Sequence, residues 1–186
     1  MERRNGTVWQ GAITKIICNH RGKADGKDFE FEIPDLVGLS AKERVEESTV
    51  GANYEYIWHG AYRSRRALMV KAEILLKLED HRPIIWSINP ILLDVLMILK
   101  SQPKDYFSLE EIISALENKE NVTNENLTQW GYYRYIDELT HKVTNIKGYR
   151  ITELGLTLLQ DSKKTMLMKK RIKCFCVGLN VCEFHK

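Results

Sequence analysis

The chain has 186 residues, of which 44% are hydrophobic and 28% charged. This composition is ordinary for a soluble globular protein with one domain or two small ones, and it argues against disorder over most of the length. The most apolar run, residues 90–99, contains Asp94 and is shorter than the roughly 20 residues that a membrane span needs. The N-terminus lacks the apolar stretch of an export signal. We therefore expect a cytoplasmic protein with no membrane partner.

The formal net charge of +3 is distributed unevenly along the chain. Residues 1–83 carry a net charge of +1, residues 84–161 carry −4, and residues 162–186 carry +6. A cationic C-terminal segment can attract nucleic acid, an acidic protein or a membrane surface, and charge alone does not choose among them. Basic residues at that end equally fit a solvated helix terminus.

The N-terminal region, residues 7–33, is predicted to be extended. Apolar residues occupy every second place from Phe29 to Ile33, which is typical of a half-buried strand. Asp25 and Gly26 form a pair that a tight hairpin turn accepts. These patterns predict a β-hairpin or a small sheet.

Two helices are predicted to follow the hairpin. Ser40 and Glu43 have the spacing of a capping box, which predicts a short helix through about residue 48. Apolar residues at intervals of three or four predict a longer helix over residues 54–78. This helix carries three clustered arginines that fit either a solvated face or a contact with phosphate or an acidic partner, namely Arg63, Arg65 and Arg66.

From Pro90 onward the pattern becomes a succession of helices and a hairpin. Asn89 and Pro90 suit the start of a first helix, and Ser108 with Glu111 predicts the start of a second. A third helix is predicted over residues 124–141, short strands over 143–146 and 149–152, and a fourth helix from 153 toward 170. Thr152 is the predicted N-cap of this last helix. The order of helix, helix, helix, hairpin and helix is typical of a winged helix.

The expected fold is therefore α+β, with a small N-terminal strand-and-helix region followed by a winged helix-turn-helix domain. The predicted divisions are residues 1–83 for the N-terminal region, 84–170 for the winged-helix domain and 171–186 for a cysteine-containing tail. No internal repeat is evident in the sequence.

Two segments of the second half resemble a known family. Tyr149-Arg-Ile-Thr-Glu-Leu-Gly155 resembles the junction between the wing and the last helix in winged-helix regulators of the MarR/PadR kind. Arg134-Tyr-Ile-Asp-Glu-Leu139 resembles the end of their recognition helix. The resemblance covers residues 88–165 and implies a homodimer that regulates transcription by binding double-stranded DNA, with no cofactor. The third helix would enter the major groove, and the wing would lie against the backbone.

The resemblance assigns the DNA contacts to the third helix and the wing. Arg can bind guanine and Gln can bind adenine with two hydrogen bonds, while Thr, Tyr and Lys can reach phosphates. The assigned residues are Thr128, Gln129, Trp130, Tyr133, Arg134, Lys142, Lys147 and Arg150. The aromatic residues among them equally fit interior packing.

A protein partner is the alternative to DNA. The charge of −4 over residues 84–161 departs from the basic surface that duplex binding usually requires. A winged-helix interaction module of phage, plasmid or defence-system origin, which binds a host protein complex, fits the same pattern.

Two further chemical interpretations remain open. Cys174, Cys176, Cys182 and His185 are zinc ligands by type, although structural zinc sites more often begin with cysteines separated by two residues. Asp28, Glu30 and Glu32, with Lys27, fit a metal-dependent nuclease strand or an ordinary charged strand. Neither pattern matches an established enzyme motif, and we expect no enzymatic activity.

Overall fold

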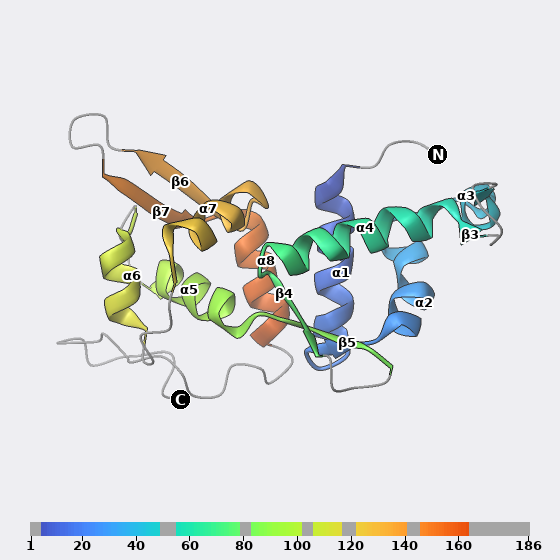
Figure 1. The fold of residues 1–186 in the computed structure, drawn as a ribbon, viewed down its shortest axis with the longest axis horizontal. Helices are drawn as coiled ribbons and strands as arrows, with labels where there is room; N and C mark the ends of the chain where they lie inside the picture. The colour runs from blue at the N-terminus through green and yellow to red at the C-terminus, as the bar shows by residue number, and fades with distance from the viewer. Residues whose placement is uncertain are drawn as a thin grey trace.

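Eight helices and seven short strands make up the part of the chain that the computed structural model describes (Figure 1). The described residues are 5–48, 55–78, 83–101, 106–116, 122–140 and 146–163. All strand pairs among them are antiparallel. The fold is therefore α+β, as the sequence predicts.

The N-terminal region is helical, so the predicted β-hairpin over residues 7–33 is wrong. Helix α1 (Gly6–Asn19) begins at Asn5, whose side chain accepts a hydrogen bond from the Thr7 amide. The apolar residues of α1 recur at the spacing of a helix, and one face is buried. The buried apolar residues are Trp9, Ala12, Ile13, Ile16, Ile17 and Cys18.

Helix α2 (Gly26–Leu36) replaces the predicted second strand. Asp25, which the sequence suggested as a turn residue, is instead the N-cap and forms a capping box with Asp28. Phe29 and Ile33 are fully buried, whereas Phe31 between them is 84% exposed. The pair four residues apart is therefore the one that packs in the core, and the alternation of apolar residues was misleading.

Shorter elements connect α2 to the next long helix. Strand β1 (Lys23–Ala24) precedes α2. Helix α3 (Ala41–Val45) begins at Ser40 in the capping box with Glu43 that the sequence predicts. Strands β2 (Glu47–Ser48) and β3 (Glu55–Tyr56) then pair with each other.

Helix α4 (Ile57–Lys71) ends earlier than predicted, and a strand follows it. Glu73 adopts a left-handed conformation with φ of 54°, and the Ile74 amide donates to the Met69 carbonyl at 2.9 Å. This arrangement closes the helix. Strand β4 (Leu75–Leu78) then pairs with β5 (Ile85–Ile88). The predicted boundary between residues 83 and 84 is wrong, because it divides this pair of strands.

The first two helices of the second half begin where the sequence predicts. Helix α5 (Pro90–Ser101) is capped by Asn89, whose side chain accepts from the Ile91 amide at 3.0 Å. Helix α6 (Leu109–Ala115) begins at Ser108 in a capping box with Glu111.

Helix α7 (Asn124–Tyr132) is shorter than the predicted helix over residues 124–141. Arg134 has φ of 60°, and the Tyr135 amide donates to the Trp130 carbonyl at 3.0 Å, which ends the helix. Strands β6 (Ile136–Thr140) and β7 (Lys147–Ile151) form a hairpin. Strand β7 overlaps the second predicted strand, whereas β6 lies in residues that were predicted to be helical. Helix α8 (Glu153–Lys163) follows Thr152, whose hydroxyl accepts from the Gly155 amide at 3.1 Å.

Two parts of the chain share one topology. The first unit, residues 6–88, runs helix α1, strand β1, helices α2 and α3, the β2–β3 pair, helix α4, and strands β4 and β5. Its main sheet has the order β1-β5-β4, and the β2–β3 pair is an addition to the shared topology. The second unit, residues 90–151, runs α5, a single bridging residue Phe107, α6, α7, β6 and β7, with Phe107 paired to β7. The strand or bridge that follows the first helix therefore pairs with the last strand in both units.

The repetition extends to individual backbone contacts. Ala24 is opposite Trp86 in the first unit, and Phe107 is opposite Tyr149 in the second. Leu75 pairs with Ile88 as Ile136 pairs with Ile151. The sequence does not display this repeat because the equivalent positions carry different side chains.

The residue after each hairpin has the same role in both units. The Asn89 amide donates to the Ile74 carbonyl at 2.9 Å, and the Thr152 amide donates to the Tyr135 carbonyl at 3.2 Å. Each side chain also donates to the preceding carbonyl, that of Glu73 or Arg134, and caps the helix that follows.

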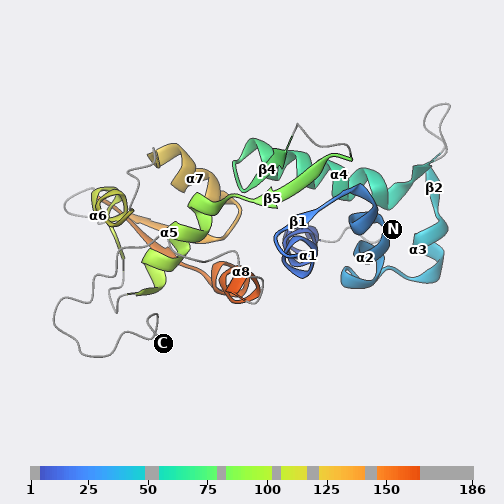
Figure 2. The same cartoon turned by 90° about the horizontal axis from the view of Figure 1, so that it is seen from below.

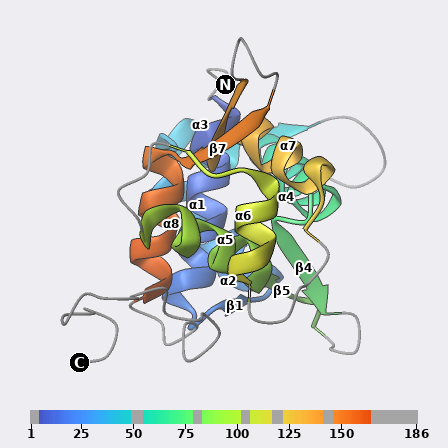
Figure 3. The same cartoon turned by 90° about the vertical axis from the view of Figure 1, so that its left-hand side faces the viewer.

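Helix α8 packs between the two units (Figures 1 and 3). It contacts α5 on one side and α1 on the other. The Lys15 ammonium lies 2.8 Å from the Asp161 carboxylate across the α1–α8 contact. The buried thiol of Cys18 lies 3.6 Å from the Ser162 hydroxyl. The last helix therefore joins the two units into one body.

Candidate nucleic-acid interface

The residues expected to face DNA differ in exposure. Five are exposed on α7, directly after it, or on β7: Thr128, Gln129, Arg134, Lys147 and Arg150. Trp130 and Tyr133 are buried, with 1% and 5% of their surface exposed. Lys142 lies outside the described residues.

Trp130 and Tyr133 hold the two units together, so their assignment to a DNA-contacting face is corrected. The Trp130 indole N–H donates to the Ala72 carbonyl in the first unit at 3.2 Å. The Gln10 amide donates to the Tyr133 carbonyl at 2.7 Å. The Arg65 guanidinium lies 4.7 Å from the centre of the Tyr133 ring. These side chains pack inside the molecule, where a base cannot reach them.

The cations of the β6–β7 hairpin are paired with carboxylates. Lys147 lies 2.7 Å from a carboxylate oxygen of Glu138. Arg150 donates through both Nε and Nη2 to one oxygen of Asp137, at 3.1 and 3.0 Å. Over its described residues, the hairpin therefore offers nearly balanced charge. Because the pairs are exposed, each contributes little stability and can be exchanged for another anion.

Arg134 is held by its backbone at the junction of α7 and β6. Its amide donates to the Gly131 carbonyl at 2.8 Å, and its carbonyl accepts from the Thr152 hydroxyl. Its side chain is exposed at the C-terminal end of α7. The structure therefore separates Arg134 from the N-terminal part of α7, which is the part that contacts bases in helix-turn-helix proteins.

Helix α4 occupies in the first unit the place that α7 occupies in the second. It carries four cations and no acidic residue between Ile57 and Lys71: Arg63, Arg65, Arg66 and Lys71. Arg63 and Lys71 are exposed, and Arg65 and Arg66 are partly buried. Sequence reasoning noted the arginine cluster but missed that α4 is the third main helix of a repeated unit. The absence of acidic residues from a helix with four cations was a usable signal.

The two partly buried arginines have structural contacts. Arg65 donates to the Gln10 side chain at 2.8 Å. Arg66 lies 3.6 Å from the centre of the Trp86 ring, and desolvation by burial lowers the pKa of its guanidinium. These two residues attach α4 to the body of the protein, so they are not part of a solvated face.

Arg63 forms an exposed ion pair. Its guanidinium lies 2.9 Å from the Glu30 carboxylate, and both side chains are about two fifths exposed, at 43% and 41%. Arg63 therefore faces solvent near α2.

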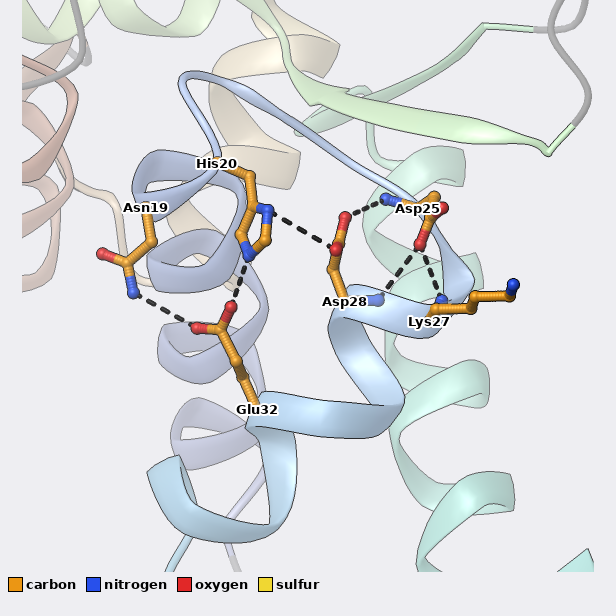
Figure 4. A network of polar contacts seen from close by, with 6 residues as sticks. All are labelled: Asn19, His20, Asp25, Lys27, Asp28 and Glu32. Atoms are coloured by element: carbon orange, nitrogen blue, oxygen red, sulfur yellow. Dashed lines mark hydrogen bonds and ion pairs between the residues drawn. The ribbon is translucent and has the colours of Figure 1, made fainter.

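The acidic residues of the nuclease hypothesis lie on helix α2 and do not converge on one site, because Asp28 and Glu32 face His20 and Glu30 does not. Asp28 belongs to the capping box with Asp25, and Glu32 contacts Asn19 and His20 (Figure 4). His20 lies between them, with Nδ1 3.4 Å from Asp28. Glu30 faces Arg63 instead. This network fixes the end of α1 against α2.

The structure brings no set of metal ligands together in its described part. Within residues 5–163, less the gaps given above, no group of three or more His, Cys, Asp or Glu side chains could hold a metal ion. Cys174, Cys176, Cys182 and His185 lie outside the described residues. Cys18 is buried, and burial raises the pKa of its thiol. The zinc hypothesis therefore stays a prediction about the C-terminal tail.

Comparisons with family models, with curated proteins and with solved structures found no match to this chain. Among the described residues, none of the helices has both the length and the apolar character that crossing a membrane requires.

Proposed function

We propose that the chain binds double-stranded DNA and regulates transcription, through a winged helix-turn-helix domain formed by its second unit with α8. The observation that carries the proposal is the order of α5, the Phe107 bridge, α6, α7 and the β6–β7 hairpin. In this order the third helix follows two others and leads directly into the hairpin, where α7 contacts β6. The major groove, about 12 Å wide, accepts one α-helix.

The exposed side of α7 carries residues that can read DNA. Thr128 and Gln129 are exposed on the helix, and Arg134 follows it. Gln can form two hydrogen bonds with adenine, and Thr can reach a phosphate. Arg134, beyond the C-terminal end of the helix, can contact the DNA backbone. Lys147 and Arg150 on β7 can contact the backbone by exchanging Glu138 and Asp137 for phosphates.

A protein partner is the second candidate, and two observations favour it. The hairpin cations are neutralised by neighbouring carboxylates. The second unit also exposes large apolar side chains, including Tyr132 at 78% and Ile146 at 58%. Exposed aromatic residues are common anchors of protein interfaces.

The expected homodimer remains a prediction, and contacts within the chain leave fewer surfaces for it. The long helices predicted over residues 54–79 and 153–170 are the candidates for its contacts. In the structure, α8 packs against α1 and α5 of the same chain. A dimer would therefore use other surfaces or the outer side of α8.

Selection from a random pool of short duplexes tests the proposal. The full chain is mixed with the pool at about 50 and 200 mM salt, and the retained duplexes are sequenced. Enrichment of a common site, with a loss of roughly 10³-fold in affinity between the two salts, supports DNA binding through several phosphates. Retention that is absent or insensitive to salt would contradict it. Light scattering of the complex gives the number of chains per duplex.

A further inference from the structure

We infer that the first unit contains a second DNA-contacting surface, in which helix α4 enters a groove and Arg63 and Lys71 contact phosphates on its two sides. This inference rests on the proposed function and extends it to a helix that the resemblance did not cover. Three observations support it: the topology of the first unit, the charge of α4 and the direction of its exposed side chains.

The topology places α4 where α7 lies in the second unit. Both helices end with a non-glycine residue in the left-handed conformation, Glu73 or Arg134. Both lead through one buried residue, Ile74 or Tyr135, into the first strand of the hairpin. If the second unit docks on DNA through its third helix, the first unit offers an equivalent helix.

The charges favour α4 over α7 for phosphate contacts. Helix α4 contains four cations and no acidic residue. Helix α7, by contrast, contains Glu125 and no cation. Each neutralised phosphate contributes about −0.9 to the slope of log affinity against log salt. The helix with the cations is therefore the stronger source of salt-dependent affinity.

The cations of α4 divide into two that are held inside and two that face out. Arg65 and Arg66 contact Tyr133 and Trp86, whereas Arg63 and Lys71 are exposed. The outer pair is separated by eight residues, which is about 12 Å along a helix. Cations this far apart can contact different phosphates of one duplex. The exposed residues between them are Ser64, Ala67 and Leu68. Ser64 and Ala67 are small, and Leu68, which is 45% exposed, can make apolar contact with a thymine methyl group.

The two third helices lie on the same side of the molecule. Figure 2 shows α4 and α7 along its upper edge, with α8 below them. The Asn126 side chain of α7 donates to the Glu73 carboxylate at the end of α4, at 2.8 Å. One duplex can therefore approach both helices from one direction.

The Arg63–Glu30 ion pair gives the sharpest test, because its two partners should have opposite effects. A labelled random duplex of about 20 base pairs is titrated with the full chain at several salt concentrations. The variants are Arg63→Gln with Lys71→Gln, Glu30→Gln alone, and a control with the same charge change on α2 and α5, Lys27→Gln with Lys100→Gln. Thermal unfolding of each variant verifies that it is folded.

The inference predicts distinct results for the three variants. In the Arg63/Lys71 variant, the slope of log affinity against log salt should be shallower by about 2. Its affinity for the duplex should fall by roughly tenfold or more. Glu30→Gln should tighten binding by about twofold to fivefold, because an anion next to Arg63 is removed. The control pair should retain the wild-type slope. If the ion pair has only a structural role, replacing either partner would instead weaken DNA binding or leave it unchanged.

Failure of the inference can be distinguished from failure of the proposed function. If the wild-type chain binds with a steep salt slope that the Arg63/Lys71 variant retains, the surface on α4 is excluded and DNA binding stands. If only the double variant Lys147→Gln with Arg150→Gln has a shallower salt dependence, the phosphate contacts belong to the second unit. If the wild-type chain shows no salt-sensitive binding, the proposed function fails and the inference fails with it.

Discussion

Helices α4 and α7 occupy equivalent places in two units of one topology, yet their surfaces differ. Helix α4 has an acid-free, cationic sequence, and α7 is acidic at its start and contributes the buried Trp130 to the contact between units. The backbone plan is shared because similar buried positions support it. The surfaces differ because few of their residues are needed for folding. Topology thus indicates where a binding helix lies, and side chains decide what it can bind.

The largest expected effect on the free energy of unfolding is that of replacing Trp130, which joins the two units. It should exceed the effect of replacing Met69, the equivalent residue in the first unit. Trp130→Ala should lower the free energy of unfolding by about 3–5 kcal/mol, since it removes a buried ring and leaves the Ala72 carbonyl without its donor. Met69→Ala, at the equivalent position of α4, should cost about 2–4 kcal/mol. Urea unfolding measures both. A cost below about 1 kcal/mol for Trp130→Ala would show that the contact between units is not stabilising.

Gly155 tests the close approach that positions the hairpin of the second unit. A Cβ atom there would lie 2.3 Å from the Tyr135 carbonyl oxygen and 2.9 Å from Ile151 Cγ1. Gly155→Ala should therefore destabilise the protein by about 3 kcal/mol. Gly131→Ala in α7 is the matched control, because its nearest atom would lie at 3.7 Å. The control should be neutral or stabilising, since alanine favours helices. Equal destabilisation of the two variants would contradict the geometry.

Strands β5 and β7 are equivalent, but only β7 carries a titratable residue, Tyr149, at the position of Trp86 in β5. Burial is the first cause that raises its pKa, from 10.0 to about 12, whereas the equivalent Trp86 does not titrate. The folded state retains the phenol proton between these values while the unfolded state loses it. Stability should thus be complete below pH 10 and decrease as pH rises toward about 12.

The Tyr149→Phe variant isolates this effect. It should reduce the alkaline decrease without removing it, because burial also raises the pKa values of Tyr62, Tyr133 and Tyr135. It should cost about 1 kcal/mol at neutral pH, through loss of the hydrogen bond from the Tyr149 hydroxyl to Asn124. Chemical unfolding across the alkaline range measures both quantities. An unchanged pH profile would exclude Tyr149 as the responsible group.

The smallest effects compare the two left-handed residues that end α4 and α7. Arg134→Gly should raise the free energy of unfolding by about 0.5 kcal/mol, because glycine adopts this conformation without a steric cost. Glu73→Gly should gain less, because it also removes the acceptor of the Asn126 side chain. Calorimetry of both variants beside Arg134→Ala measures the difference. If Arg134→Ala raised the free energy of unfolding as much as Arg134→Gly does, relief of the left-handed conformation would be excluded as the cause of the gain.

The sequence predicted the elements whose signals are local. Ser40, Asn89, Ser108 and Thr152 were all recognised as helix caps, and each caps its helix in the structure. Capping depends on a side chain and a backbone amide two or three residues away, so it can be read from sequence.

The missed features depend on contacts between distant segments. Phe29 to Ile33 alternates like a strand, but only the packing of α2 against α1 decides that Phe29 and Ile33 are buried together. Phe29 also lies against Tyr62 of α4, with ring centres 6.3 Å apart. The predicted third helix ran past Arg134 because a left-handed arginine carries none of the sequence signal that glycine provides.

The candidate interface could be predicted only in part. Thr128, Gln129 and Arg134 are exposed as expected, and a helical period suffices to predict that. Trp130 and Tyr133 are buried by the first unit, which no local pattern in the second half encodes. The equivalence of α4 and α7 became visible only through strand pairing.

The most direct test of the central claim is to map backbone amide chemical shifts while the full chain is titrated with a random duplex at about 50 mM salt. The account predicts the largest changes at the exposed residues of α4 and α7, Arg63, Ser64, Lys71, Thr128 and Gln129, and their reversal when salt is added. Shifts confined to other elements, or no shift at either helix, would contradict the claim that these two helices form the DNA-binding face.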